Sequence, residues 1–181
     1  KRIALALTAL TALTTLRAIE TKAAATFGDD ITFLRRHTET VVLSDKSGQA
    51  QVAVVPAWQG RVMTSTARGA KGASFGWVNR ELIASGQVQP HINVFGGEDR
   101  FWLGPEGGQY SIFFKKGDPF DLAHWQTPPP VDSEPFEVVA RERDRARFRR
   151  TMQLQNYQGN RFDLEVTRDV RLLGGAEVEK A

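Results

Sequence analysis

The sequence predicts an all-β fold, either a β-sandwich or a β-barrel. Short runs rich in β-branched residues recur between turn-forming residues, and only one short segment has the signals of a helix. The 181 residues are 41% hydrophobic and 25% charged, which allows one packed domain and argues against global disorder. No repeat of fixed period is present, and Thr127–Pro130 is typical of a stiff surface connector rather than a domain boundary.

The N-terminus has the pattern of a secretory signal peptide, which we expect to span residues 1–25. Lys1 and Arg2 precede an uncharged run, Ile3–Leu16, which is too short to cross a bilayer comfortably, and the small residues Ala23–Ala25 follow. No cysteine follows the run to carry a lipid, so we expect a periplasmic or extracellular protein without a stable membrane anchor. A buried or amphipathic N-terminal helix stays open as an alternative, because charged residues lie between the run and the cleavage site.

Strands are expected from residue 26 onward. Thr40–Ser44 and Ala50–Val55 are β-rich and flank Asp45–Gly48, whose composition suits a hairpin turn. The same reasoning gives further strands at Arg61–Thr66, Tyr110–Phe114, Phe136–Arg141, Ala146–Gln155 and Phe162–Leu172.

One helix is expected beyond residue 26. Asn79 can cap a helix over Arg80–Ser85, and Gly86 can end it. We expect no other notable helix after the signal peptide.

Arginines alternate with other residues between Arg141 and Arg150. On an extended chain the five arginines at odd positions share one face, so the pattern indicates a solvated strand face with a turn near Asp144. We therefore expect a hairpin with an exposed basic face. Phosphate binding would call for more surrounding lysines, and the net charge of the whole chain is only +3, so we expect no nucleic-acid partner.

Composition narrows the possible chemistry. The chain has no cysteine, which excludes thiol catalysis, disulfides and thiolate metal sites within it. The three histidines, His37, His91 and His124, are far apart in sequence. We expect no cofactor.

The run His91–Tyr110 is the part of the chain most suggestive of a binding site. It combines several glycines with three carboxylates, an arginine and aromatic rings. Flexible backbone beside flat rings and charged hydrogen-bonding groups suits a polar, ring-shaped ligand such as a sugar. A structural alternative is equally open, because glycine-rich turns in large β-proteins also collect aromatics and charges as plugs.

Two motifs in this region resemble the aldose 1-epimerase (galactose mutarotase) family. Phe75–Gly86 is similar to the family motif in which a glycine and an aromatic precede Asn-Arg-Ile and a later glycine. Asn93–Gly97, followed by Trp102, is similar to the family's Asn-x-Leu-His-Gly-Gly and its later Trp. Upstream, Val54–Arg61 stands where those proteins run a strand into a glycine turn.

A second resemblance covers more of the chain. Gly96–Gln109 is closer still to exported bacterial proteins of unknown function that share the mutarotase-like fold, and the similarity extends from about residue 35 to the end. The implied fold is a galactose mutarotase-like β-supersandwich. Residues 26–181 would form its N-terminal part.

The resemblance also implies a binding site. Asn79 and Arg80 match the family's substrate-binding arginine and the asparagine before it. Phe95 stands where the family has a substrate-contacting histidine, and a phenyl ring can only stack where an imidazole can bond hydroxyls. The expected substrate-binding residues are Asn79, Arg80, Glu98, Asp99, Arg100, Trp102 and Glu106.

Catalytic residues are harder to assign. Interconverting sugar anomers needs a base and an acid on opposite sides of one ring, and the family's catalytic His and Glu lie beyond the matched region. We therefore expect the acid/base pair beyond Ala181. Candidates near the glycine-rich run, none at a catalytic position of the family, are Glu98, Asp99, Glu106, His91 and His124.

Those carboxylates also admit other interpretations. Glu98 and Asp99 can pair with Arg100, and Glu106 can cap a turn. A glycosidase pair of Glu98 and Glu106 would require a suitable separation across a cleft. The three carboxylates lack the alternating ligands of a calcium loop, so we expect no metal.

Two hypotheses of different classes follow for a protein that binds a sugar or oligosaccharide. The first is a carbohydrate-active enzyme of the epimerase type whose catalytic half lies outside this chain. The second is a non-catalytic carbohydrate-binding module, which Phe95 favours.

Overall fold

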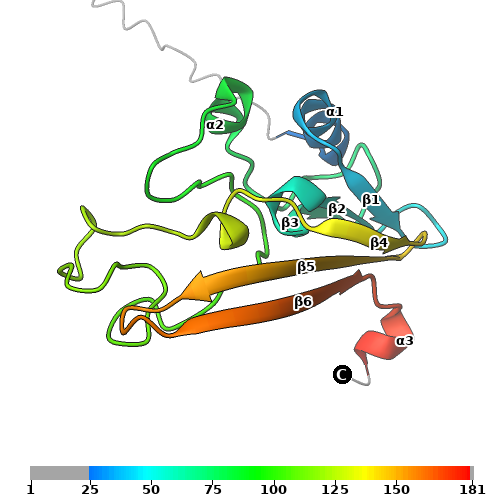
Figure 1. Cartoon of the computed structure of the whole chain (residues 1–181). Helices are drawn as coiled ribbons and strands as arrows, with labels where there is room; N and C mark the ends of the chain where they lie inside the picture. Colours follow the sequence, from blue (N-terminus) through cyan, green and yellow to red (C-terminus); the bar gives the residue numbers. More distant parts are fainter. Residues whose placement is uncertain (1–24, 180–181) are drawn as a thin grey trace, which may run out of the picture.

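Two antiparallel three-stranded sheets form the frame of the protein in a computed structural model that describes residues 25–179 (Figure 1). The sheets have the strand orders β1-β2-β3 and β4-β5-β6. The strands are β1 (Val41–Ser44), β2 (Gln51–Val55), β3 (Arg61–Thr66), β4 (Glu137–Arg141), β5 (Arg145–Gln155) and β6 (Arg161–Arg171). The fold is therefore mostly β, as the sequence predicts. All of the expected signal peptide except Ala25 lies outside the described residues.

The first sheet is buried on both faces. Val41 and Leu43 of β1, with Val54 of β2, pack against the second sheet, in a core that includes Phe136 and Phe148. Ala53 and Val55 of β2 point the opposite way, because successive side chains of a strand alternate between faces. They pack against the helices, so the molecule has three layers: helices, first sheet and second sheet.

The helix α1 (Phe27–His37) was not expected, and the prediction of a single helix beyond residue 26 is wrong. Thr26 and Asp29 form a capping box, with the Asp29 N–H donating to Thr26 Oγ1 at 3.2 Å and the Thr26 N–H donating to Asp29 Oδ2 at 3.0 Å. Phe27, Ile31 and Leu34 share the face that packs on the first sheet. These signals are present in the sequence, but they directly follow the segment read as a signal peptide.

The helix α2 (Arg80–Ser85) forms as predicted. The Asn79 side chain accepts a hydrogen bond from the Leu82 N–H at 3.2 Å, and Gly86 ends the helix in the left-handed conformation, with φ of 63°. The short elements η1 (Pro56–Trp58), η2 (Pro129–Val131) and α3 (Gly175–Val178) complete the list of helices in the described part of the chain.

Six of the seven predicted strands form, with bounds that differ by at most one residue at each end. Tyr110–Phe114 is the exception, and that prediction is wrong. Ser111 and Phe113 are buried, but their backbone bonds to turns and loops: the Ser111 N–H donates to the Gly108 carbonyl at 3.0 Å, and the Phe113 N–H donates to Ser111 Oγ at 3.1 Å. This segment is apolar because it packs aromatic rings, not because it joins a sheet.

The arginine-rich segment forms the predicted hairpin, β4 turning into β5 around Asp144. Acidic partners balance its exposed face. Arg145 and Arg147 both bind Asp169 of β6, at 3.1 and 3.0 Å, and Arg149 binds Glu137. Their hydrogen bonds lower the pKa of Asp169 to about 2. The face is thus one of mixed charge.

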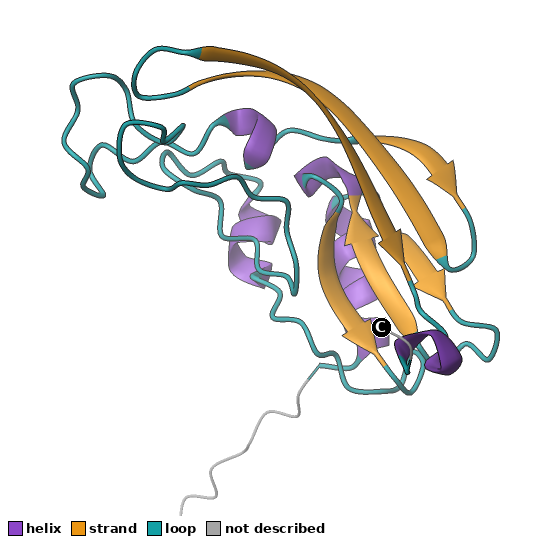
Figure 2. Cartoon of the chain, turned by 90° about the horizontal axis from the view of Figure 1, so that it is seen from below, coloured by secondary structure: helices purple, strands orange, loops and turns teal. Residues whose placement is uncertain are grey.

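Long loops between β3 and β4 gather at one end of the two sheets (Figures 1 and 2). They meet the turn that joins β5 to β6, where the Tyr157 N–H donates to the Ser111 carbonyl at 2.7 Å. The loops contain the glycine-rich run and supply most of the candidate site. None of the helices within residues 25–179 is long and apolar enough to span a membrane.

Candidate functional site

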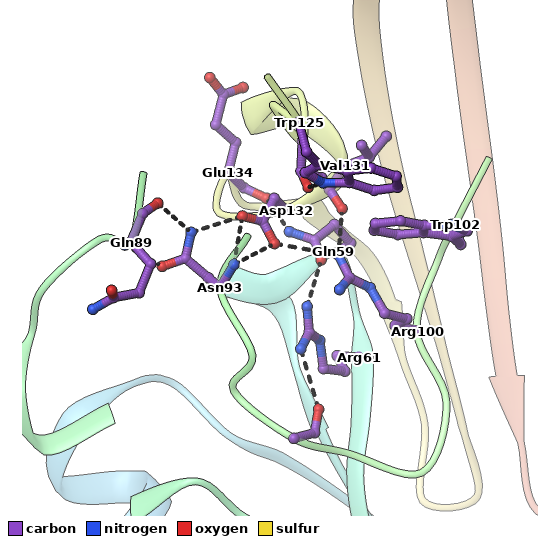
Figure 3. Close-up of polar contacts among 12 residues, drawn as sticks. Gln59, Arg61, Gln89, Asn93, Arg100, Trp102, Trp125, Val131, Asp132 and Glu134 are labelled. Atoms are coloured by element: carbon purple, nitrogen blue, oxygen red, sulfur yellow. Dashed lines mark hydrogen bonds and ion pairs between the residues drawn. The ribbon is translucent and has the colours of Figure 1, made fainter. Parts of the chain in front are cut away.

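A buried carboxylate, Asp132, stands at the centre of the polar network at this end of the protein (Figure 3). It directly follows η2 and is 3% exposed. Its Oδ2 accepts from the backbone N–H of Asn93 at 2.9 Å and from the Asn93 side-chain amide at 2.7 Å. Its Oδ1 accepts from Arg100 Nη2 at 3.3 Å. Both oxygens are therefore occupied within the protein.

Asn93 links the carboxylate to the loop before it. The residue is 1% exposed, and its Oδ1 accepts from the Gln89 N–H at 2.8 Å. The amide nitrogen donates to Asp132 and the amide oxygen accepts from Gln89, so both ends of the amide have partners. Asn93 and Asp132 thus brace the loop around residues 89–93 against the segment that follows η2.

Arg100 closes the network on its other side. Its Nη2 also donates to the Val131 carbonyl at 2.8 Å, and its guanidinium lies 4.1 Å from the centre of the Trp102 ring. Burial lowers the pKa of Arg100, while its contact with Asp132 acts in the opposite direction. Asp132 is buried and Arg100 is partly buried, so removing Arg100 would leave a costly buried charge.

A second arginine, Arg61 of β3, is buried beside this network. It is 1% exposed and donates to the Gly96 carbonyl at 3.1 Å and to Gln59 Oε1 at 3.4 Å. No carboxylate within residues 25–179 forms an ion pair with it. Burial, followed by repulsion from Arg100, lowers the pKa of Arg61 to about 9. The one buried carboxylate nearby, Asp132, pairs with the partly buried Arg100, so the buried Arg61 leaves this region with excess positive charge.

Three aromatic rings stack beside Arg100. The centre of Phe113 lies 4.9 Å from that of Trp102 and 4.5 Å from that of Trp125, and both pairs are nearly parallel. The Trp125 indole N–H donates to Thr127 Oγ1 at 2.9 Å, which fixes the orientation of its ring. Phe114 meets Trp125 edge to face. The stack fixes the otherwise irregular segments 101–103 and 111–127 against each other.

A pocket of about 520 Å³, hereafter the Asp132 pocket, opens beside the aromatic stack. On its other side lies the hydrogen-bonded pair of Asn93 and Asp132, hereafter the brace. Buried polar residues, Asn93, Asp132 and Asn156, line it together with apolar side chains. Asp132 is the sole acidic residue of the lining. The remaining lining residues are Val88, Gln89, Pro90, Ile112, Phe113, Phe114, Lys115, Lys116, Gln126, Thr127, Pro128, Pro129, Ser133 and Gln155.

The residues expected from the resemblance lie in three places. Arg80 binds the buried Asp30 of α1 at 2.5 Å and lies over the Phe33 ring, while Asn79 caps α2. Glu98 accepts from Ser65 Oγ at 2.9 Å.

Asp99 forms an ion pair with Arg168 of β6. The alternative interpretation in which Glu98 and Asp99 pair with Arg100 is therefore wrong. Arg100 lies over Trp102, and the Trp102 indole donates to Glu106 at 2.9 Å, so these three residues do lie together.

No histidine is among the residues that line the Asp132 pocket. His91 Nδ1 lies 2.6 Å from the Trp125 carbonyl, and His124 Nδ1 lies 2.6 Å from Asp121, whose hydrogen bond raises the pKa of His124. No cluster of three or more metal-ligating side chains occurs among the residues that the structure describes.

Comparison with known proteins adds one relationship. A family model described as a family of unknown function, DUF6786, matches residues 25–181. The chain belongs to the DUF6786 family. The region shared with other DUF6786 proteins thus contains both sheets and the Asp132 pocket. No curated protein and no solved structure matches the chain significantly.

Sequence reasoning did not identify the main residues of the pocket in this DUF6786 protein. Asn93 was noted only as part of a motif, and Asp132 follows three prolines in what reads as a surface connector. No local pattern links them, because they are 39 positions apart and meet only in the folded chain. The one available signal was a polar, turn-forming residue within an apolar setting, Pro130-Val131-Asp132.

Proposed function

We propose that the protein binds carbohydrate, and that the ligand occupies the Asp132 pocket. The observation that carries the proposal is the joining of a braced polar floor to an apolar lining in one pocket of about 520 Å³. A sugar presents hydroxyl groups around its ring and C–H groups on its faces. It therefore requires fixed donors and acceptors beside apolar surface, which is the composition of this pocket.

The polar groups of the pocket divide into a brace and a binding set. Asn93 and Asp132 use their hydrogen-bonding capacity on each other and on Gln89 and Arg100. The side chains of Gln89 and Ser133, and the amide nitrogen of Asn156, have no hydrogen-bond partner among the described residues. We assign hydroxyl binding to these free groups, held in place by the brace.

We further propose that the two sheets are the N-terminal part of a mutarotase-like supersandwich. In support, the two motifs that carry the resemblance lie side by side. The Asn79 N–H donates to the Phe95 carbonyl at 3.0 Å, and the Asn79 side-chain amide donates to the Val94 carbonyl at 2.9 Å. Val78 and Gly96 form a β-bridge. The two motifs, which are separated in sequence, are therefore in direct contact in the folded chain.

A binding module is favoured over an enzyme. No histidine lines the Asp132 pocket, and its one carboxylate is held by three donor groups, so the lining offers no opposed acid and base. The epimerase-type enzyme is the second candidate, supported by the adjacent motifs, with its acid/base pair expected beyond Ala181. In either case we propose that the protein is exported.

Calorimetric titration with a panel of monosaccharides and oligosaccharides tests the binding function. We expect at least one sugar to bind, and Gln89→Ala or Ser133→Ala to weaken its binding by about 0.5–1.5 kcal/mol, the contribution of one neutral hydrogen bond. Gln158→Ala is the matched control, because Gln158 is exposed and bonds Gln109 outside the pocket. Absence of binding by every sugar would refute the proposal.

Polarimetry distinguishes a binding module from an epimerase-type enzyme. A binding module leaves the interconversion of α- and β-anomers at its uncatalysed rate, whereas an epimerase accelerates it.

A further inference from the structure

We propose that the Asp132 pocket selects acidic saccharides, sugars that carry a carboxylate, over neutral ones. This inference rests on the proposed carbohydrate-binding function and concerns the charge that the pocket presents to its ligand.

The accessible charge of the lining is positive. Lys115 and Lys116 are adjacent, exposed, and both line the pocket. Neither forms an ion pair within residues 25–179. Asp132 is the sole acidic lining residue, and both of its oxygens are occupied by Asn93 and Arg100. The pocket is therefore bordered by two lysines without ion-pair partners and by no free carboxylate.

The charge behind the pocket has the same sign. Arg100 neutralises Asp132, while Arg61 is 1% exposed and has no carboxylate partner in the described part of the chain. Charges in buried surroundings are screened less by salt than those in water. Arg61 cannot reach a ligand directly, but its field adds to that of the two lysines. An anionic group in the pocket is stabilised from both directions.

The rest of the lining requires a sugar rather than a bare anion. Gln89, Ser133 and Asn156 offer neutral hydrogen bonds, and Ile112, Phe114 and Pro129 offer apolar contact. A free phosphate or sulfate ion would use the lysines and leave these groups without partners. A uronic acid has a carboxylate, hydroxyls and an apolar ring face, so it can use all three parts.

Calorimetry with paired glycosides tests the inference. Methyl glucuronoside and methyl glucoside differ only in a carboxylate in place of a hydroxymethyl group, and the galacturonide and galactoside form a second pair. We expect the acidic member of at least one pair to bind about tenfold more tightly, the effect of one charge-assisted hydrogen bond. The preference should fall as salt is added.

The double variant Lys115→Gln, Lys116→Gln should abolish the preference, so that the acidic and the neutral glycoside of a pair bind with equal affinity. The matched control is Lys46→Gln, Lys71→Gln, since both of these lysines are exposed and lie outside the pocket lining. Sodium sulfate and sodium acetate serve as sugar-free anions, which we expect to bind more weakly than the uronides.

The outcomes distinguish the two proposals. Equal binding of acidic and neutral glycosides, or a preference that survives the double lysine variant, overturns the charge inference and leaves the binding function standing. Sulfate or acetate binding as tightly as the uronides overturns the assignment to saccharides. Absence of binding by every glycoside overturns the proposed function itself.

Discussion

The side-chain amide of Asn93 donates a 2.7 Å hydrogen bond to the carboxylate of Asp132, and the two residues are 1% and 3% exposed. They lie 39 positions apart and belong to loops on either side of the same pocket. Since polar groups are costly to bury without partners, this pair fixes both loops in one arrangement.

Asp132→Ala should lower the free energy of unfolding by about 1.5–3 kcal/mol, because it leaves the buried Asn93 donors without their acceptor and the partly buried Arg100 without its carboxylate. Urea denaturation at neutral pH measures the change. Asp163→Ala is the control, since Asp163 is exposed and bonds only Gln153. An Asp132 variant as stable as the wild type would show that the pair does not brace the loops.

Gly96→Ala should destabilise the protein by about 1–3 kcal/mol or more. A Cβ at Gly96 would lie 2.1 Å from the Trp77 carbonyl oxygen, and its φ of +91° is unfavourable for alanine. Gly107→Ala is the matched control, because a Cβ there meets no atom within 4 Å. The measurement is the midpoint temperature of thermal unfolding of each variant. Equal midpoint temperatures would mean that the backbone around Gly96 adjusts freely.

Arg80→Ala should reduce stability by about 1.5–3 kcal/mol, since Arg80 is the ion-pair partner of the buried Asp30. Binding in the Asp132 pocket should be unaffected. Arg36→Ala, an exposed change on α1, provides the control. If sugar binding instead falls by that amount while stability is retained, Arg80 is a substrate-binding residue, as the resemblance implies.

The contribution of Asp169 to the thermal unfolding midpoint should be lost in acid. Arg147 and Arg145 lower its folded pKa to about 2, below its ordinary value of 3.8, so its contribution to stability is present above about pH 4. That contribution is lost as the pH falls through 2, because the folded carboxylate is then protonated. The wild type and Asp169→Asn should therefore differ slightly at pH 5 and converge near pH 2. A constant difference across this range would contradict the assignment.

Mature protein recovered from cells should begin near Thr26 and lie outside the cytoplasm. The charged start, the apolar run and the small residues of 1–25 motivate this prediction. N-terminal sequencing of the periplasmic or secreted fraction measures it. An intact N-terminus in the cytosol would disprove export.

Local sequence patterns predicted the elements that depend on interactions between residues close in sequence. The cap at Asn79 and the stop at Gly86 specify α2, and alternating residues specify β5 and β6. Tyr110–Phe114 failed because apolar aromatic residues pack equally well in irregular chain, where Phe113 joins the ring stack. Apolar composition indicates burial, but it does not by itself indicate a strand.

The candidate site was predicted less well, because tertiary contacts create it. The glycine-rich run does contribute Asn93, Arg100 and Trp102 to the network. Its decisive partner, Asp132, comes from a proline-rich segment that carries no motif. Lys115 and Lys116 look like ordinary surface lysines until the fold places them beside the pocket.

The contrast between a long hairpin and a loop-built pocket has a consequence for hydrogen exchange. The β5–β6 ladder pairs residues continuously from Arg145↔Arg171 to Gln155↔Arg161, so its amides should exchange slowly. The amides of Gln89 and Asn93 donate only to single side chains, and a brief separation of Asn93 from Asp132 exposes them. The pocket should therefore open and close many times during the lifetime of one folded hairpin, and a bound ligand should slow exchange at these two amides first.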